Sequence, residues 1–161
     1  MNTERREFLE LVDTHGAAIW SVLRRMCGNA ADADDVFQET ALRVWRKFGD
    51  KPILRNPRGW LMTIAYRASI DHQTRRRSQD VLIDSPDTRL PSPDEQAEHS
   101  EECARLSATI DTLPPQYREV VVLHYTGGLT LKQTAEAMDI SLGTVKSRLN
   151  TALERLRSVM Q

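Results

Sequence analysis

The chain has 161 residues, of which 40% are hydrophobic and 6% aromatic, and its formal net charge is −1. Such a balance is typical of one or two small soluble domains, and no apolar run reaches the ~18 residues of a membrane span. The first residues lead into an amphipathic stretch and not into a secretory signal, and two scattered cysteines agree with a reducing cytoplasm.

The near-neutral total conceals a strong pattern of charge along the chain. Residues 1–42 carry a net charge of −4, residues 43–77 carry +8, residues 78–112 carry −7, and residues 113–161 carry +2. Two basic blocks separated by an acidic one predict two nucleic-acid contacts joined by a tether that DNA repels.

Apolar residues recur at helical spacing in three stretches of the first half of the chain. The predicted helices are residues 8–26, 29–48 and 56–77. Gly28 ends the first helix, and Asn29 can cap the second, which stops at Gly49. A capping Asn56 followed by Pro57 is a strong start signal for the third helix.

An acidic, proline-containing stretch without a sustained period follows these helices and predicts a linker. The predicted division is a domain at 1–78, a linker at 79–94 and a domain at 95–161. Ser92, Pro93 and Glu95 form a capped start for a helix that runs to Thr112. One more helix is predicted over residues 117–125. With no alternating strand pattern, the chain is predicted to be all-α.

The last third of the chain predicts two short helices joined by a tight turn. Thr130 and Gln133 form a capping box for the first helix, and Ser141 caps the second. The second helix has one apolar stripe, and its other faces are polar and basic, as in a helix that enters the major groove of DNA. The predicted DNA contacts are Thr130, Ser141, Thr144, Lys146, Ser147, Arg148, Asn150 and Thr151. An ordinary helical hairpin with a solvated basic face is the alternative.

Three stretches, in this order, resemble the extracytoplasmic-function (ECF) sigma factors, the minimal two-domain class of the sigma-70 family of bacterial initiation factors. They are residues 32–45, residues 57–65, and residues 113–120 continuing through the helix-turn-helix. The resemblance implies a non-catalytic protein that needs no cofactor. Its partners would be promoter DNA and core RNA polymerase, contacted at the β′ clamp helices and the β flap.

The resemblance also implies roles for residues of the first domain. Polymerase docking would use Asp35, Gln38, Glu39, Arg43 and Arg46, with Trp45 beneath this face or at its rim. Charge pattern alone favours a solvated helix face there. Recognition and opening of the −10 element would use Arg55, Asn56, Arg58, Arg67, Arg75, Arg76 and Arg77. The loop 49–56 would capture a flipped base, and the helix-turn-helix would recognise the −35 element. Trp60 is either core or a stacking platform, and Asp71 is expected to pair with an arginine.

Asn150-Thr151 departs from the family pattern, because many relatives carry basic residues there. We therefore expect weaker phosphate binding and a different base preference at that point. Two other functions stay open: a free, dimeric helix-turn-helix regulator, and a sigma-like protein that occupies polymerase or an inhibitor without starting transcription. Anti-sigma proteins often hold the family inactive, but no residue demonstrates one here. We expect a monomer when free, and His99 with Cys103 is too small a set for a metal site.

Overall fold

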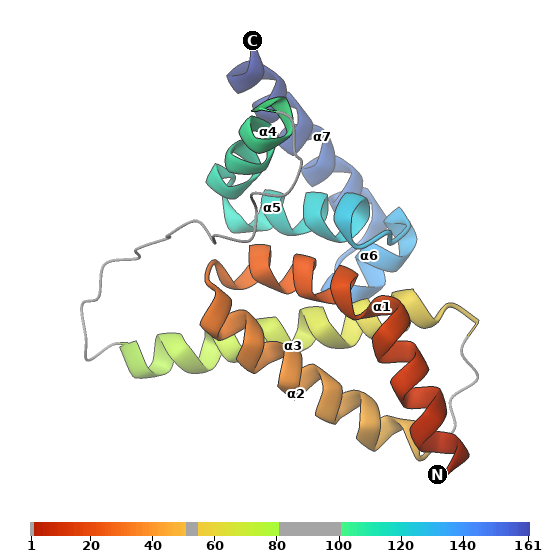
Figure 1. Cartoon of the computed structure of the whole chain (residues 1–161). Helices are drawn as coiled ribbons and strands as arrows, with labels where there is room; N and C mark the ends of the chain where they lie inside the picture. The colour runs from red at the N-terminus through yellow and green to blue at the C-terminus, as the bar shows by residue number, and fades with distance from the viewer. Residues whose placement is uncertain (1, 51–54, 81–100) are drawn as a thin grey trace. The chain divides into compact units, whose positions relative to one another are not determined.

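The computed structural model describes residues 2–50, 55–80 and 101–161, which are mainly α-helical and contain no β-strand. The chain divides into two compact units, Met1–Arg89 and Leu90–Gln161 (Figure 1). The all-α fold class is therefore confirmed. Most of the predicted linker, the loop residues 51–54 and the helix start predicted at Ser92 lie outside the described residues. No helix in the described part is long and apolar enough to cross a membrane.

The N-terminal unit consists of three helices that pack against one another (Figure 1). They are α1 (Thr3–Cys27), α2 (Ala30–Phe48) and α3 (Pro57–Asp80). The predicted start signals are present: the Asn29 side chain accepts from the Asp32 backbone N–H at 2.9 Å, and that of Asn56 accepts from Gly59 at 3.0 Å. Gly28 ends α1 with φ 81°, a left-handed conformation that glycine adopts without strain.

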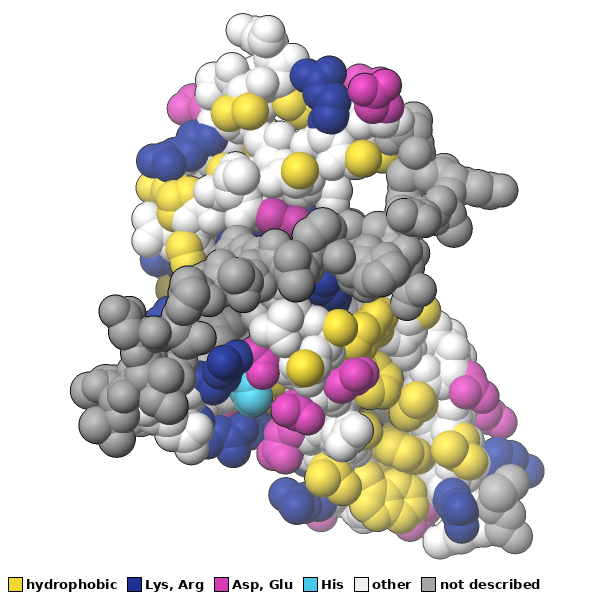
Figure 2. Space-filling model, turned by 60° about the vertical axis from the view of Figure 1, so that its left-hand side comes forward, with side chains coloured by type: hydrophobic (Ala, Val, Ile, Leu, Met, Phe, Trp, Pro, Cys, Tyr) yellow, Lys and Arg dark blue, Asp and Glu magenta, His cyan; other side chains and the backbone are white. Residues whose placement is uncertain are grey.

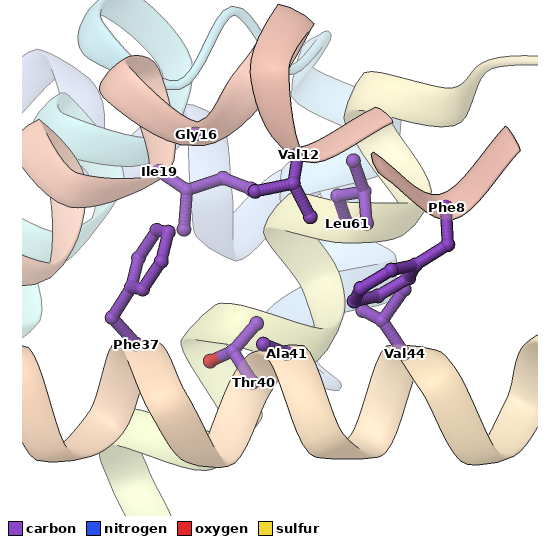
Figure 3. A pocket seen from close by; sticks show the side chains of 9 residues that line it. All are labelled: Phe8, Val12, Gly16, Ile19, Phe37, Thr40, Ala41, Val44 and Leu61. Carbon is purple, nitrogen blue, oxygen red and sulfur yellow. The ribbon is translucent and has the colours of Figure 1, made fainter. Parts of the chain in front are cut away.

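All three helices contribute to the apolar core of this unit, in which Leu23, Val36 and Met62 are at most 1% exposed. Burying each such side chain contributes roughly 1.5–3 kcal/mol to folding. A hollow of about 20 Å³ remains between α1 and α2, beside Gly16 and Phe37 (Figure 3). Its lining is apolar apart from Thr40, whose hydroxyl donates to the Val36 carbonyl at 2.7 Å.

Helix α3 is longer than the sequence pattern predicted, because it continues through Asp80. The apolar period fades at the arginine run, but no glycine or proline follows until Pro86. The hydroxyls of Thr74 and Ser78 also donate to the carbonyls of the preceding turn, so the helix stays satisfied where its apolar face ends.

The C-terminal unit is built from four α-helices and a π-helical turn. These are α4 (Glu101–Thr112), α5 (Pro115–Val121), the π turn (Val122–Thr126), α6 (Leu131–Met138) and α7 (Leu142–Met160). The core combines side chains from α5, α6 and α7 with Leu113. Helix α4 contributes no buried side chain, although Ile110 packs at the edge of this core.

The π turn replaces the end of the uniform helix that was predicted over residues 117–125. The Gly127 N–H donates to the Val122 carbonyl at 2.8 Å, and the Leu129 N–H donates to the Leu123 carbonyl at 3.1 Å. Only glycine fits at 127, since a Cβ there would lie 2.6 Å from the Leu123 carbonyl oxygen. The wider turn is closed by His124, whose Nδ1 lies 2.6 Å from the Leu129 carbonyl oxygen.

Candidate nucleic-acid and partner interfaces

Helices α6 and α7 form the helix-turn-helix that the sequence predicted. Thr130 Oγ1 accepts from the Gln133 N–H at 3.0 Å, and Gln133 Oε1 accepts from the Thr130 N–H at 2.9 Å, which completes the capping box. The turn passes through Asp139, whose φ of 54° is left-handed. Ser141 Oγ then accepts from the Thr144 N–H at 3.1 Å and starts α7.

Helix α7 has a buried side and an opposite exposed side. Its buried residues are Val145, Leu149, Ala152 and Leu156. Ser147, Asn150 and Glu154 share the opposite side, because positions i, i+3 and i+7 align along one face of a helix. Lys146 and Arg148 are about 200° apart around the axis and flank this exposed side. The predicted base-contacting residues are thus divided between a central stripe and two basic edges.

Several predicted DNA contacts already serve the fold. The hydroxyls of Thr130 and Ser141 are helix caps, and Thr144 Oγ1 lies 2.8 Å from Ser141 Oγ. The Thr151 hydroxyl donates to the Ser147 carbonyl at 3.1 Å. In the described part of the chain, the side chains of Lys146, Ser147, Arg148 and Asn150 have no such partner. These four are the polar groups of the predicted set that remain available.

The face of α2 predicted to dock on polymerase has an apolar centre. Asp35, Gln38 and Arg46 are exposed along it. Between them, Leu42 is 51% exposed and Trp45 is 44% exposed. The Trp45 ring lies at the rim, edge-on to Phe8 with 5.2 Å between ring centroids. Sequence reasoning did not select Leu42, although it is an apolar residue on the polar side of the α2 period.

Glu39 and Arg43, the other two predicted docking residues, are half-buried and paired. Arg43 Nε donates to Glu39 Oε1 at 3.0 Å, and Arg43 Nη1 donates to Asp71 Oδ2 at 2.8 Å. Burial lowers the pKa of Arg43, but the bonds to the two carboxylates outweigh it and raise the pKa overall. The expected pairing of Asp71 with an arginine is confirmed, and it ties α3 to α2.

Asp32 is the centre of a second tie between the same helices. Its Oδ2 accepts from Asn29 Nδ2 at 2.7 Å and from Arg76, and His72 Nε2 lies 3.3 Å from its Oδ1. Burial raises the pKa of Asp32, but the Asn29 amide, His72 and Arg76 together lower it below its ordinary value. The Gln73 amide adds a bond to the Met26 carbonyl at 3.0 Å, which joins α3 to the end of α1.

The residues predicted for −10 recognition lie at both ends of α3 and just before it. Arg55, Arg67, Arg75 and Arg77 are exposed, whereas Arg58 is half-buried. The Asn56 amide oxygen caps α3, and Arg76 is held by Asp32. Trp60 is half-buried, which leaves both of its predicted roles open.

The described residues contain no group of three or more His, Cys, Asp or Glu side chains arranged to hold a metal ion. Cys27 is half-buried near Asp32, and this burial together with the carboxylate raises its pKa to about 12. A thiol with that pKa stays protonated at neutral pH and is a poor nucleophile.

Two family models match the chain, one in each unit. The model described as Sigma-70 region 2 matches residues 11–79, and the model described as Sigma-70, region 4 matches residues 103–156. The first match covers most of α1 through α3, and the second extends from α4 into α7.

Known proteins resemble the chain over nearly its whole length. The ECF RNA polymerase sigma factor SigL of Mycobacterium tuberculosis is 34% identical over 156 residues, which cover 94% of this chain and 87% of SigL. The ferric citrate uptake sigma factor FecI of Escherichia coli is 32% identical over 151 residues, which cover 91% and 87%.

Two solved structures have a similar fold. One is CnrH in complex with the cytosolic domain of CnrY, with 26% identity, a TM-score of 0.68, and coverage of 97% of this chain and 88% of that one. The other is the sigma factor RpoE of Bartonella quintana in complex with the anti-sigma factor NepR. It is 24% identical with a TM-score of 0.75, covering 97% and 95%.

Proposed function

Because the chain belongs to the ECF RNA polymerase sigma factors of the sigma-70 family, we propose a division of its work between the two units. The protein binds core RNA polymerase, recognises the −10 and −35 promoter elements and promotes melting. It carries out no covalent chemistry, which the polymerase supplies. Sigma factors of this family work in the cytoplasm, and we assign this chain to that compartment.

The N-terminal unit docks on polymerase through α2. The observation that carries this assignment is the exposed pair Leu42 and Trp45, set among Asp35, Gln38 and Arg46. Binding energy concentrates in apolar and aromatic side chains that a partner buries, and the charged rim steers the encounter. A merely solvated helix face would not need two large apolar residues at its centre.

The same unit contacts the −10 element through the start of α3 and its exposed side. Arg55, Arg58, Arg67 and Arg77 supply cations for phosphates, and Asn56 lies at the helix start beside the loop that would hold a flipped base. Cations and a site that receives an unstacked base are the two requirements for holding melted DNA.

The C-terminal unit recognises the −35 element with α7 in the major groove. Ser147 and Asn150 face the base edges, and Lys146 and Arg148 bind the phosphates on either side. The support is the separation of exposed stripe and basic edges on α7, together with the free side chains of these four residues.

An anti-sigma protein is a further proposed partner. The support is the likeness to CnrH, whose structure was solved with the cytosolic domain of CnrY. The exposed Leu42 and Trp45 would be covered by such an inhibitor in competition with polymerase.

Run-off transcription tests the proposed function. The purified chain, bacterial core polymerase and promoter fragments from the source genome should give discrete transcripts that require the added protein. Leu42→Glu should abolish them by preventing polymerase binding, whereas Leu9→Glu, an equally exposed leucine on α1, should leave them in place. Stable polymerase binding without transcripts would favour the titrating protein. DNA binding without polymerase binding would favour the free regulator.

A further inference from the structure

A groove between α2 and α3 carries charges of opposite sign on its two walls. Its volume is about 320 Å³; Asp35 and Glu39 line it from α2, and His72, Arg75 and Arg76 line it from α3. Figure 2 shows basic and acidic side chains side by side on one face of the molecule, with a histidine among them. The buried residues Val36 and Ala68 form the floor of the groove.

The groove divides the arginine run at the end of α3. Consecutive residues of an α-helix point about 100° apart, so Arg75, Arg76 and Arg77 cannot share one direction. Arg75 and Arg76 line the groove, whereas Arg77 does not. Arg76 is already bonded to Asp32. Within the described residues, Arg75 is thus the arginine of the run that faces the groove without an ion-pair partner.

Asp35 is the matching free charge on the α2 wall. It is exposed and has no partner within the described part of the chain. Asp35 and Arg75 line one groove but are not within the 4.0 Å of an ion pair. A partner that enters the groove, excludes water and meets both charges gains more than solvent offers either of them.

The acidic wall also decides which kind of partner fits. A DNA phosphate approaching Arg75 would lie opposite Asp35 and Glu39, which repel it. A protein surface that presents a carboxylate to Arg75 and a cation to Asp35 meets no such opposition. Asp35 is moreover the first residue of the α2 face that carries Leu42 and Trp45, so the groove continues that face onto α3.

We propose that this groove extends the polymerase-docking surface onto α3, and that Arg75 binds an acidic side chain of polymerase instead of a promoter phosphate. The proposal rests on the polymerase-binding function given above. It assigns the arginine run to two partners: Arg75 to protein and Arg77 to DNA, with Arg76 held inside the fold.

Charge reversal tests the protein contact. Fluorescently labelled full-length chain is titrated with core RNA polymerase at several salt concentrations. Arg75→Glu should raise the Kd by at least about tenfold at low salt, because it places like charges opposite one another, and this loss should shrink as salt rises. Arg5→Glu makes the same charge change at an exposed position of α1 outside the proposed surfaces and should stay within about twofold. Arg75→Lys should retain binding within about twofold.

The salt dependence of promoter binding tests the DNA contact. Holoenzyme with Arg75→Ala should show the wild-type slope of log K against log salt, whereas Arg77→Ala should lower it by about 0.9, one phosphate contact. A lowered slope for Arg75→Ala, or an unchanged polymerase Kd for Arg75→Glu, would overturn the proposal. If the wild-type chain itself failed to bind polymerase, the function proposed above would fail, and not the groove alone.

Discussion

Asn150 lies opposite the buried stripe of α7, and no hydrogen bond among the described residues uses its side chain. A carboxamide can bind the edge of adenine through two hydrogen bonds, whereas a lysine or arginine at the flank of a helix binds phosphate whatever the base. Base preference should therefore depend on Asn150, and general affinity on Lys146 and Arg148.

Two variants separate these roles. Asn150→Ala should reduce discrimination at one adenine-containing base pair of the −35 element by about 1–3 kcal/mol, with the salt slope unchanged. Lys146→Ala should lower the slope by about 0.9 and leave the base preference as it is. Anisotropy titrations of holoenzyme against −35 duplexes substituted at each position measure both quantities. Equal loss on every duplex with Asn150→Ala would exclude base recognition by this residue.

Asp32 should make stability depend on pH, because its pKa is lowered in the folded chain from the ordinary value of 3.8. A lowered pKa means that the ionised form stabilises the fold above pH 3.8, and that this stabilisation is lost as pH falls through the folded-state value. Asp32→Asn should therefore cost about 1–3 kcal/mol at pH 7 and progressively less below pH 4. Urea denaturation at both pH values measures the difference, and a constant difference would contradict it.

At the scale of helices, two glycines should respond in opposite directions to the same substitution. In Gly16→Ala the new Cβ would lie 3.7 Å from Phe37 and 3.8 Å from Val12, in ordinary contact beside the α1–α2 hollow. Because glycine inside a helix costs about 0.5–1 kcal/mol relative to alanine, this variant should be more stable by that amount. Gly127→Ala should lose about 1–3 kcal/mol, since its Cβ overlaps the Leu123 carbonyl. Thermal melts of both variants measure the signs, and equal signs would refute the explanation.

Local signals predicted most of the helices, because the caps at Asn29, Asn56, Thr130 and Ser141 depend on residues within one turn. The sequence pattern did not predict the π turn. Its apolar residues fit an α-helix equally well, and only the close approach at Gly127 distinguishes the two.

The candidate site was less predictable than the fold, because its pairings are long-range. Arg43 meets Asp71 from 28 residues away, and Arg76 meets Asp32 from 44 residues away. Nothing in the three consecutive arginines indicates which of them the fold neutralises, or that only two line a groove. The exposure of Leu42 likewise follows from how α1 and α3 cover α2, which the period of α2 alone does not give.

At the scale of the whole molecule, each unit has a hydrophobic core of its own. We therefore expect fragments 1–80 and 101–161 to fold separately, each with a cooperative thermal transition. The smaller fragment should melt at the lower temperature, because a domain of about 60 residues buries a smaller share of its surface. Far-UV circular dichroism of the two fragments should sum to that of the intact chain. A non-cooperative transition in either fragment would show that its core needs the other unit.

The two ties between α2 and α3 have a consequence for how the protein is distributed in a bacterial cell. Arg43 and Arg76 belong to the most basic block of the sequence, yet both face carboxylates of their own chain, and the net charge is only −1. Few uncompensated cations remain to attract the chromosome, whose 10⁶–10⁹ competing sites, roughly, would otherwise sequester a basic protein. The free factor is thereby kept off bulk DNA, and newly made molecules stay in the pool from which polymerase recruits them.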